Sequence, residues 1–125
     1  HPGIRDWHKR TNEQLSRTRT VWNKFGYRII YFDRMESLLP KGLAWIPQST
    51  VALTCLKGMR RTEQAFPFIQ MLLQTHDSTT FQIPIACEDK LPAIAKTLEI
   101  EVPYDDPLVI PWSITTSLES WGNCA

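Results

Sequence analysis

A short polar turn between two strand-like segments is the feature that most constrains the fold of this chain. Residues 68–73 are mostly apolar, which is typical of a strand buried on both faces, and Thr80–Ile85 alternates apolar with polar side chains. We expect these segments to pair as an antiparallel hairpin with Asp77 at or near its tip. A rigid strand pair can hold such a carboxylate for metal binding. Asp and Ser are also ordinary turn residues, so a purely structural role stays open.

The first third of the chain predicts a helix followed by a small hairpin. Residues 4–20 contain no Gly or Pro, and their apolar side chains recur at helical spacing. Residues 21–32 are rich in aromatic and β-branched side chains around a single Gly, which favours two short paired strands. Residues 33–47 contain Pro and Gly and predict a loop, with a bend at 38–42.

The remaining segments complete an α+β pattern. A second helix is predicted to begin near residues 49–50, where two hydroxyl side chains can cap it. Glu88–Leu98 predicts a third helix with acidic residues in its first turn. Residues 109–110 and 112–115 predict an edge strand interrupted by a proline. The expected fold is therefore an antiparallel, hairpin-based sheet packed with helices.

Length and cysteine usage narrow the class of protein. A chain of 125 residues fits one domain, and no apolar run approaches the roughly 18 residues that a membrane span needs. Three cysteines without metal-ligand spacing fit a reducing, cytoplasmic setting, with Cys55 as a small core residue. A membrane partner is therefore not expected.

The net charge of +1 conceals a division along the chain. Residues 1–61 carry twelve Lys/Arg and four Asp/Glu, a net charge of +8, whereas residues 62–125 carry two and nine, a net charge of −7. The basic half also contains Trp7, Trp22 and Tyr27, which could stack on bases beside phosphate contacts. The alternative is that both halves fold together and these charges only solvate a surface.

Four ordered blocks share a resemblance to one enzyme family. They are His1-Pro2-Gly3-Ile4-Arg5, Phe25-Gly26-Tyr27-Arg28 with Ile30-Tyr31, Pro47-Gln48-Ser49-Thr50-Val51-Ala52, and Leu73-Gln74-Thr75-His76-Asp77-Ser78. Together with the tail Ser120-Trp121-Gly122-Asn123-Cys124-Ala125, they resemble the carboxyl-terminal part of family A DNA polymerases, the bacterial DNA polymerase I type and its phage relatives. The resemblance implies that residues 1–47 end the fingers and that residues 48–125 belong to a palm.

The resemblance also implies a reaction and its participants. A DNA-directed DNA polymerase transfers nucleotides with two Mg²⁺ ions about 3.5–4 Å apart, using template–primer DNA and deoxynucleoside triphosphates. Asp77 would be a catalytic metal-ligating carboxylate, and His76 would lie beside the primer terminus and position it. A satisfied structural histidine remains the alternative for His76.

Several other positions are implied as DNA contacts. Gln48 matches a family residue near the minor groove of the template–primer, although an exposed loop amide is the alternative. Gln74 also matches, and as a polar residue in an apolar strand it is expected to form a hydrogen bond. Backbone contacts are expected from four basic residues, each of which could instead be solvated surface: Arg28, Lys57, Arg60 and Arg61.

The chain departs from the family pattern in ways that affect activity. Ser78 stands where the family usually has Glu, and the family's other catalytic aspartate and its nucleotide-binding fingers helix are not in this sequence. Only one metal ligand is therefore expected here, and activity would require an amino-terminal polymerase fragment. Two alternatives remain: a non-catalytic nucleic-acid-binding α+β module, and a structural protein with an accidental resemblance.

Overall fold

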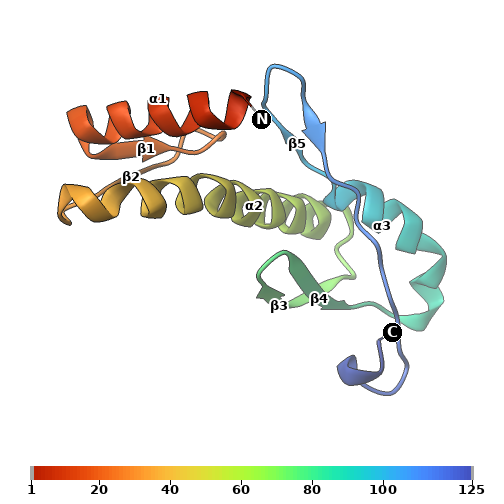
Figure 1. Cartoon of the computed structure of the whole chain (residues 1–125). Helices are drawn as coiled ribbons and strands as arrows, with labels where there is room; N and C mark the ends of the chain where they lie inside the picture. The colour runs from red at the N-terminus through yellow and green to blue at the C-terminus, as the bar shows by residue number, and fades with distance from the viewer. Residues whose placement is uncertain (1, 125) are drawn as a thin grey trace. The chain divides into compact units, whose positions relative to one another are not determined.

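A computed structural model describes residues 2–124 of the chain (Figure 1). His1 and Ala125, the outermost residues of two blocks named above, lie outside the described residues. Within the described part the fold is α+β, with three α-helices and three two-stranded antiparallel sheets. The chain divides into two compact units, 1–51 and 52–125, which are described separately.

Unit 1 begins with the helix and the small hairpin that the sequence predicts. Helix α1 spans Pro2–Thr18, strand β1 spans Thr20–Trp22 and strand β2 spans Arg28–Ile30. The two strands pair antiparallel, so that Trp22 lies opposite Arg28. Both elements are confirmed, with the strands shorter than the expected segment 21–32.

The buried side chain of Asn23 closes this small hairpin. Its Oδ1 accepts hydrogen bonds from the backbone N–H groups of Phe25 and Tyr27, each at 3.0 Å. Gly26 completes the turn with a φ of 80°, a conformation that glycine adopts without steric cost. The Asn23 side chain therefore stabilises the turn by accepting hydrogen bonds from the backbone N–H groups within it.

The predicted loop at residues 33–47 is wrong. A 3-10 turn at Met35–Ser37 leads directly into helix α2, which spans Leu38–Ala65 and begins eleven residues before Ser49. The hydroxyls of Ser49 and Thr50 do not cap a helix start. They donate instead to the carbonyl of Ile46 within α2, at 3.3 and 2.7 Å.

Packing explains why the proline and glycine signals misled this prediction. Pro40 is the third residue of α2, where a backbone N–H has no intrahelical acceptor, so its missing N–H costs nothing. Pro47 does remove one helical hydrogen bond. The core of unit 1 offsets that loss, because α2 contributes the buried Leu38 and the partly buried Trp45 and Ile46 to the cluster around Leu15.

Gly42 allows α2 to pack close to α1 and does not form the bend that the sequence predicts at residues 38–42. A Cβ built on Gly42 would lie 2.9 Å from Cδ1 of Leu15, a fully buried residue of α1. The absence of a side chain therefore lets α2 pack closely against α1 within unit 1. A sequence pattern cannot separate this use of glycine from its use in turns.

Unit 2 contains the hairpin that most constrained the sequence. Strands β3 (Gln70–Thr75) and β4 (Ser78–Gln82) pair antiparallel, which confirms the hairpin with both strands nearer the turn than expected. The prediction that the first strand is buried on both faces is wrong, because Leu72 and Leu73 are 54% and 45% exposed. A register shift at Leu72 and a sheet of only two strands leave that face uncovered.

The rest of unit 2 differs from the sequence in detail. Helix α3 spans Leu91–Leu98 and follows a 3-10 segment at Ile85–Lys90, so only the second part of the predicted third helix is α-helical. The expected edge strand is limited to β6 (Leu108–Val109), which pairs with β5 (Glu101–Val102). Residues 112–115 form no strand.

The core of unit 2 forms where α3 meets the β3–β4 hairpin. Ile94 and Leu98 of α3 are fully buried with Ile69, and Phe81 of β4 and Trp112 pack against them. Trp112 thus contributes to the core rather than to a strand. This packing supplies most of the apolar burial that holds the hairpin in place.

None of the helices formed by residues 2–124 is long and apolar enough to cross a membrane.

Candidate functional site: the tip of the β3–β4 hairpin

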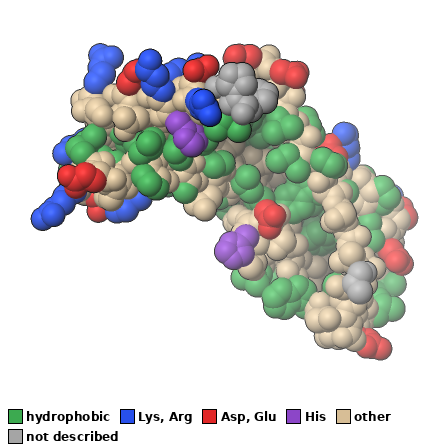
Figure 2. Space-filling view, viewed as in Figure 1, with side chains coloured by type: hydrophobic (Ala, Val, Ile, Leu, Met, Phe, Trp, Pro, Cys, Tyr) green, Lys and Arg blue, Asp and Glu red, His purple; other side chains and the backbone are tan. Residues whose placement is uncertain are grey.

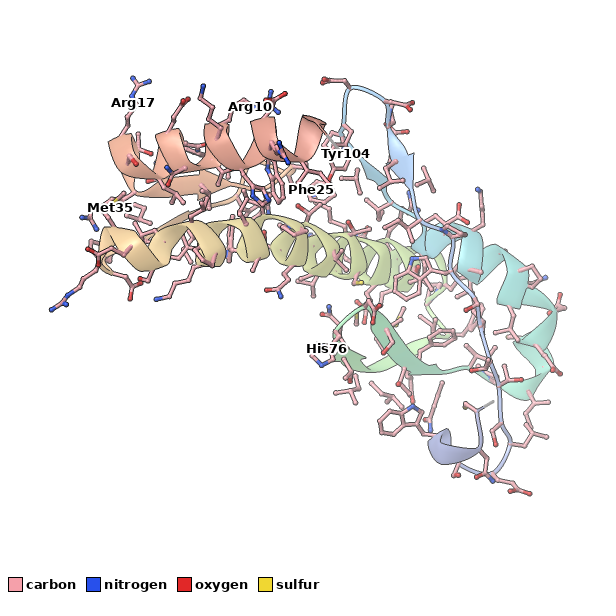
Figure 3. All side chains as sticks on the ribbon, in the orientation of Figure 1. Arg10, Arg17, Phe25, Met35, His76 and Tyr104 are labelled. Atoms are coloured by element: carbon pink, nitrogen blue, oxygen red, sulfur yellow. The ribbon has the colours of Figure 1, made fainter. Side chains whose placement is uncertain are left out.

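His76 and Asp77 form the whole connection between β3 and β4. Thr75 pairs with Ser78, so these two residues are the central residues of a two-residue turn. His76 has a φ of 53°, the sign that tight hairpin turns require at their first central position. Both side chains are exposed, and Figure 3 shows His76 at the end of the hairpin. The geometry therefore presents an imidazole and a carboxylate together at a solvent-accessible tip.

Side-chain hydrogen bonds fix this turn from both strands. The Ser78 hydroxyl donates to the carbonyl of Thr75 at 2.8 Å, and the Gln74 amide donates to the carbonyl of His76 at 3.3 Å. Gln74 thus has a hydrogen-bonding role, and its contact with DNA stays a prediction. Ser78, which departs from the family pattern, stabilises the turn instead of adding a second charge.

The Asp77 carboxylate acts electrostatically on α2. Burial is the larger cause that raises the pKa of the Cys55 thiol, and the negative charge of Asp77 raises that pKa further. Cys55 is 3% exposed, which confirms its predicted place in the core. The charge of Asp77 is therefore close enough to a buried residue of α2 to be felt there, within unit 2.

The basic residues of α2 divide into two kinds. Lys57 and Arg60 are exposed on the helix. The guanidinium of Arg61 donates to the carbonyl oxygens of Thr97 (Nε to O 2.7 Å) and Glu99, at the end of α3. Cations are favourable at that end of a helix, so Arg61 has a structural partner inside unit 2.

Two predicted DNA contacts belong to unit 1. Arg28 is an exposed residue of β2, and Gln48 is an exposed residue in the middle of α2 rather than in a loop. The structure thus brings Gln74, His76 and Asp77 together on one hairpin and places Arg28 and Gln48 in the other unit. All of these DNA contacts remain predictions.

The donor set at the tip fits one ligand of a magnesium site. Mg²⁺ favours carboxylate oxygens and is commonly bound through one or two carboxylates plus substrate phosphates. Asp77 supplies one such carboxylate with no hydrogen-bond donor already engaging it among the described residues. Residues 2–124 contain no group of three or more His, Cys, Asp or Glu side chains that could hold a metal ion.

The sequence singled out Trp22 as a stacking group but did not indicate which basic residues lie beside it. Arg10, Gln14 and Arg17 of α1 line a shallow hollow with Trp22 of β1. Their i, i+4, i+7 spacing along one helical face is the signal that could have indicated it.

Comparison with known proteins yields no match: no family model, no curated protein and no solved structure is similar to this chain. The resemblance to family A DNA polymerases therefore stays an expectation from the sequence blocks.

Proposed function

We propose that this chain is the carboxyl-terminal palm part of a DNA-directed DNA polymerase, active when an amino-terminal polymerase fragment completes it. The observation that carries the proposal is the position of Asp77. Asp77 is exposed to solvent at the tip of a two-stranded hairpin, and the hydrogen bond from the Ser78 hydroxyl to the Thr75 carbonyl holds the turn that carries it.

Within this proposal, each residue of the tip has a task that its geometry supports. Asp77 would hold Mg²⁺, which when bound supplies the electrostatic stabilisation that nucleotidyl transfer requires. The exposed imidazole of His76 would orient the primer terminus. Gln74 would maintain the turn through its hydrogen bond to the His76 carbonyl.

The proposal requires a second carboxylate from outside this chain. A two-metal site needs more than one acidic ligand, and the resemblance implies that the second catalytic aspartate lies in a motif outside this sequence. The amino-terminal fragment would provide that carboxylate together with the nucleotide-binding helix. Magnesium dependence should therefore appear only in the completed enzyme.

The decisive experiment is primer extension with Mg²⁺ by this chain mixed with an amino-terminal polymerase fragment. The mixture should extend the primer, and neither piece should do so alone. Asp77→Ala should lower the extension rate by at least about 100-fold, the scale expected for loss of one electrostatic transition-state contact. Asp105→Ala is the matched control, because Asp105 is an exposed aspartate between β5 and β6.

An unchanged rate in Asp77→Ala, or an equal loss in Asp105→Ala, would contradict the proposal. Circular dichroism of each variant would establish that a lost rate does not reflect a lost fold. His76→Ala should have a smaller effect than Asp77→Ala, since an orienting group carries no metal.

A specific observation also favours a non-catalytic nucleic-acid-binding module as a second candidate. Residues 1–51 carry nine Lys/Arg and four Asp/Glu, a net charge of +5, whereas residues 52–125 carry five and nine, a net charge of −4. A basic unit of this kind attracts phosphates without any metal. Under this alternative, Asp77→Ala leaves DNA affinity intact or improves it, and no amino-terminal fragment restores extension.

A further inference from the structure

The surface of unit 1 contains a hollow where helix α1 passes the end of strand β1. It is a shallow hollow of about 430 Å³, more open to solvent than enclosed. Its walls come from three kinds of side chain: the cations Arg10 and Arg17, the polar residues Glu13, Gln14 and Thr18, and the aromatic Trp22.

The charged groups of this hollow are not used by the fold. Arg10 and Arg17 have no hydrogen-bond or ion-pair partner among residues 2–124, although Glu13 is placed at helical spacing from both. The two arginines are seven positions apart on the helix, so they lie on one face about 10 Å apart along its axis (both are labelled in Figure 3). Lys and Arg side chains gather over the α1 part of the chain in Figure 2.

Trp22 provides an aromatic surface beside these cations. It lines the hollow and is 42% exposed, so part of the indole is available for stacking. Arg28 is its direct cross-strand partner, so the two side chains lie on the same face of the hairpin. Arg28 does not line the hollow itself, so it adds a third cation beside Trp22.

We propose that the hollow and Arg28 together bind single-stranded nucleic acid, with one unstacked base on Trp22 and the phosphates on either side held by Arg10, Arg17 and Arg28. Aromatic stacking combined with a basic track is the usual chemistry of single-strand binding. This site is independent of metal binding at Asp77, and it goes beyond the polymerase proposal because no block of that resemblance includes Arg10, Arg17 or Trp22.

The arrangement favours a strand over a mononucleotide or an acidic peptide. A mononucleotide would leave at least one of the three arginines without a phosphate, because Arg28 lies outside the hollow. An acidic peptide would pair with the arginines but would gain nothing from an exposed indole. Net charge in the hollow is only +1, so attraction by charge alone is weak there and stacking must contribute.

Glu13 and Gln14 give the hollow polar groups for the edge of the base. The Gln14 side chain is half-buried and forms no hydrogen bond among the described residues, so its amide can donate to and accept from a base. The Thr18 hydroxyl is already engaged, since it donates to the Gln14 carbonyl at 3.0 Å. The Glu13 carboxylate can only accept, so it can take a hydrogen bond from a ring N–H such as the N3–H of thymine.

The test is the binding of a fluorescently labelled (dT)12 oligonucleotide to the full chain, measured by anisotropy over a range of salt concentrations. The double variant Arg10→Ala/Arg17→Ala should weaken binding and make the slope of log K against log salt shallower by about 1.4, because each lost phosphate contact on a single strand removes about 0.7. Trp22→Leu should weaken binding on the order of 10-fold with an unchanged slope, since stacking releases no counterions. Trp22→Phe should restore most of that loss.

Two control variants distinguish binding at the hollow from non-specific electrostatic attraction and from the proposed polymerase activity. Lys9→Ala removes a cation that lies on α1 outside the hollow, and it should leave the slope nearly unchanged. Asp77→Ala should abolish primer extension while leaving (dT)12 affinity intact, so the two proposals can fail separately.

Three results would overturn the assignment. The first is that the hollow variants weaken (dT)12 binding no more than Lys9→Ala does. The second is that dTMP competes as well as the oligonucleotide, which would indicate a mononucleotide site. The third is that a poly-glutamate peptide binds with the same dependence on Arg10 and Arg17 and none on Trp22.

Discussion

The two units use the same device, a glycine that lets α2 approach a neighbouring element, but the neighbours differ in kind. In unit 1, a Cβ on Gly42 would meet the end of the Leu15 side chain at 2.9 Å. In unit 2, a Cβ on Gly58 would lie 2.4 Å from the backbone carbonyl oxygen of Leu98. A side chain can rotate away from an added methyl group, whereas a helix terminus can move only as a whole.

This difference indicates where each unit tolerates change. The contact in unit 1 is between packed side chains, which relax over short distances. The contact in unit 2 joins α2 to the end of α3, and α3 in turn packs behind the hairpin that holds Asp77. The four predictions below test this contrast, beginning with the largest expected effect.

Gly58→Ala should lower the free energy of unfolding by about 2–3 kcal/mol. Ala favours a helix by up to about 1 kcal/mol over Gly, but the clash with the Leu98 carbonyl requires α3 to shift, and overpacking of this kind outweighs the propensity gain. Urea denaturation monitored by circular dichroism would measure the loss. A stability equal to that of the wild type would show that α3 moves freely, and the contrast between units would fail.

Arg61→Ala should lower the free energy of unfolding by about 1 kcal/mol. The Arg61 guanidinium donates hydrogen bonds to the carbonyl oxygens of Thr97 and Glu99 at the end of α3. In the variant, water would hydrate these carbonyl groups because the site is exposed, so the loss of stability is small. Arg60→Ala is the matched control on the same helix and should have almost no effect on urea denaturation. An equal effect of both variants would indicate general charge rather than the contact with α3.

Gly42→Ala should change the free energy of unfolding by less than about 1 kcal/mol. The gain in helix propensity and the cost of displacing Leu15 are of similar size and opposite sign. In a Leu15→Ala background the clash disappears, so the same substitution should stabilise by about 1 kcal/mol. A double-mutant cycle from urea titrations measures both values, and an identical effect in the two backgrounds would remove Leu15 from the explanation.

The smallest effect concerns the ionisation of Cys55. Burial and then the charge of Asp77 raise the pKa of its thiol in the folded protein, so the unfolded chain ionises first as the pH increases. This contribution to stability is complete below the ordinary thiol pKa of about 8.5 and is lost as the pH rises through the folded value. In a background with Cys87→Ser and Cys124→Ser, alkylation of Cys55 should begin at lower pH when Asp77→Asn is added.

The alkylation experiment also tests the position of the hairpin tip. Only a carboxylate held near α2 within unit 2 can influence Cys55. Glu101→Gln, a charge removal in β5, is the control and should leave the pH profile of alkylation unchanged. If Asp77→Asn also leaves it unchanged, the tip is not fixed beside this part of α2.

Local patterns predicted the elements whose stability is local. The helix over residues 4–20 and the hairpin around Asp77 were predicted because helical spacing and the alternation of β4 are set by residues close in sequence. The start of α2 was missed because Pro40, Gly42 and Pro47 have the composition of a loop. Their helical conformation depends on Leu15, which is distant in sequence.

Only the position of the candidate site could be predicted locally, and its function stays a prediction. Asp77 was predicted at or near a hairpin tip and lies there, since adjacent turn residues need no distant partner. The turn role of Ser78 was an open alternative, whereas the sequence did not indicate that Arg61 binds the end of α3. Nor could it show that Trp22, Arg17 and Arg10 line one hollow, because β1 and α1 must first pack.

The sequence by itself determined the first helix with its small hairpin, the turn that contains Asp77 and the unequal charge of the two parts of the chain. Only the tertiary structure decided where α2 begins, which glycines are contacts, and which cations remain available for a ligand. The physical reason is the distance along the sequence over which each interaction acts. Turn geometry and helical periodicity act over a few residues, whereas burial and close approach depend on side chains that meet only after folding.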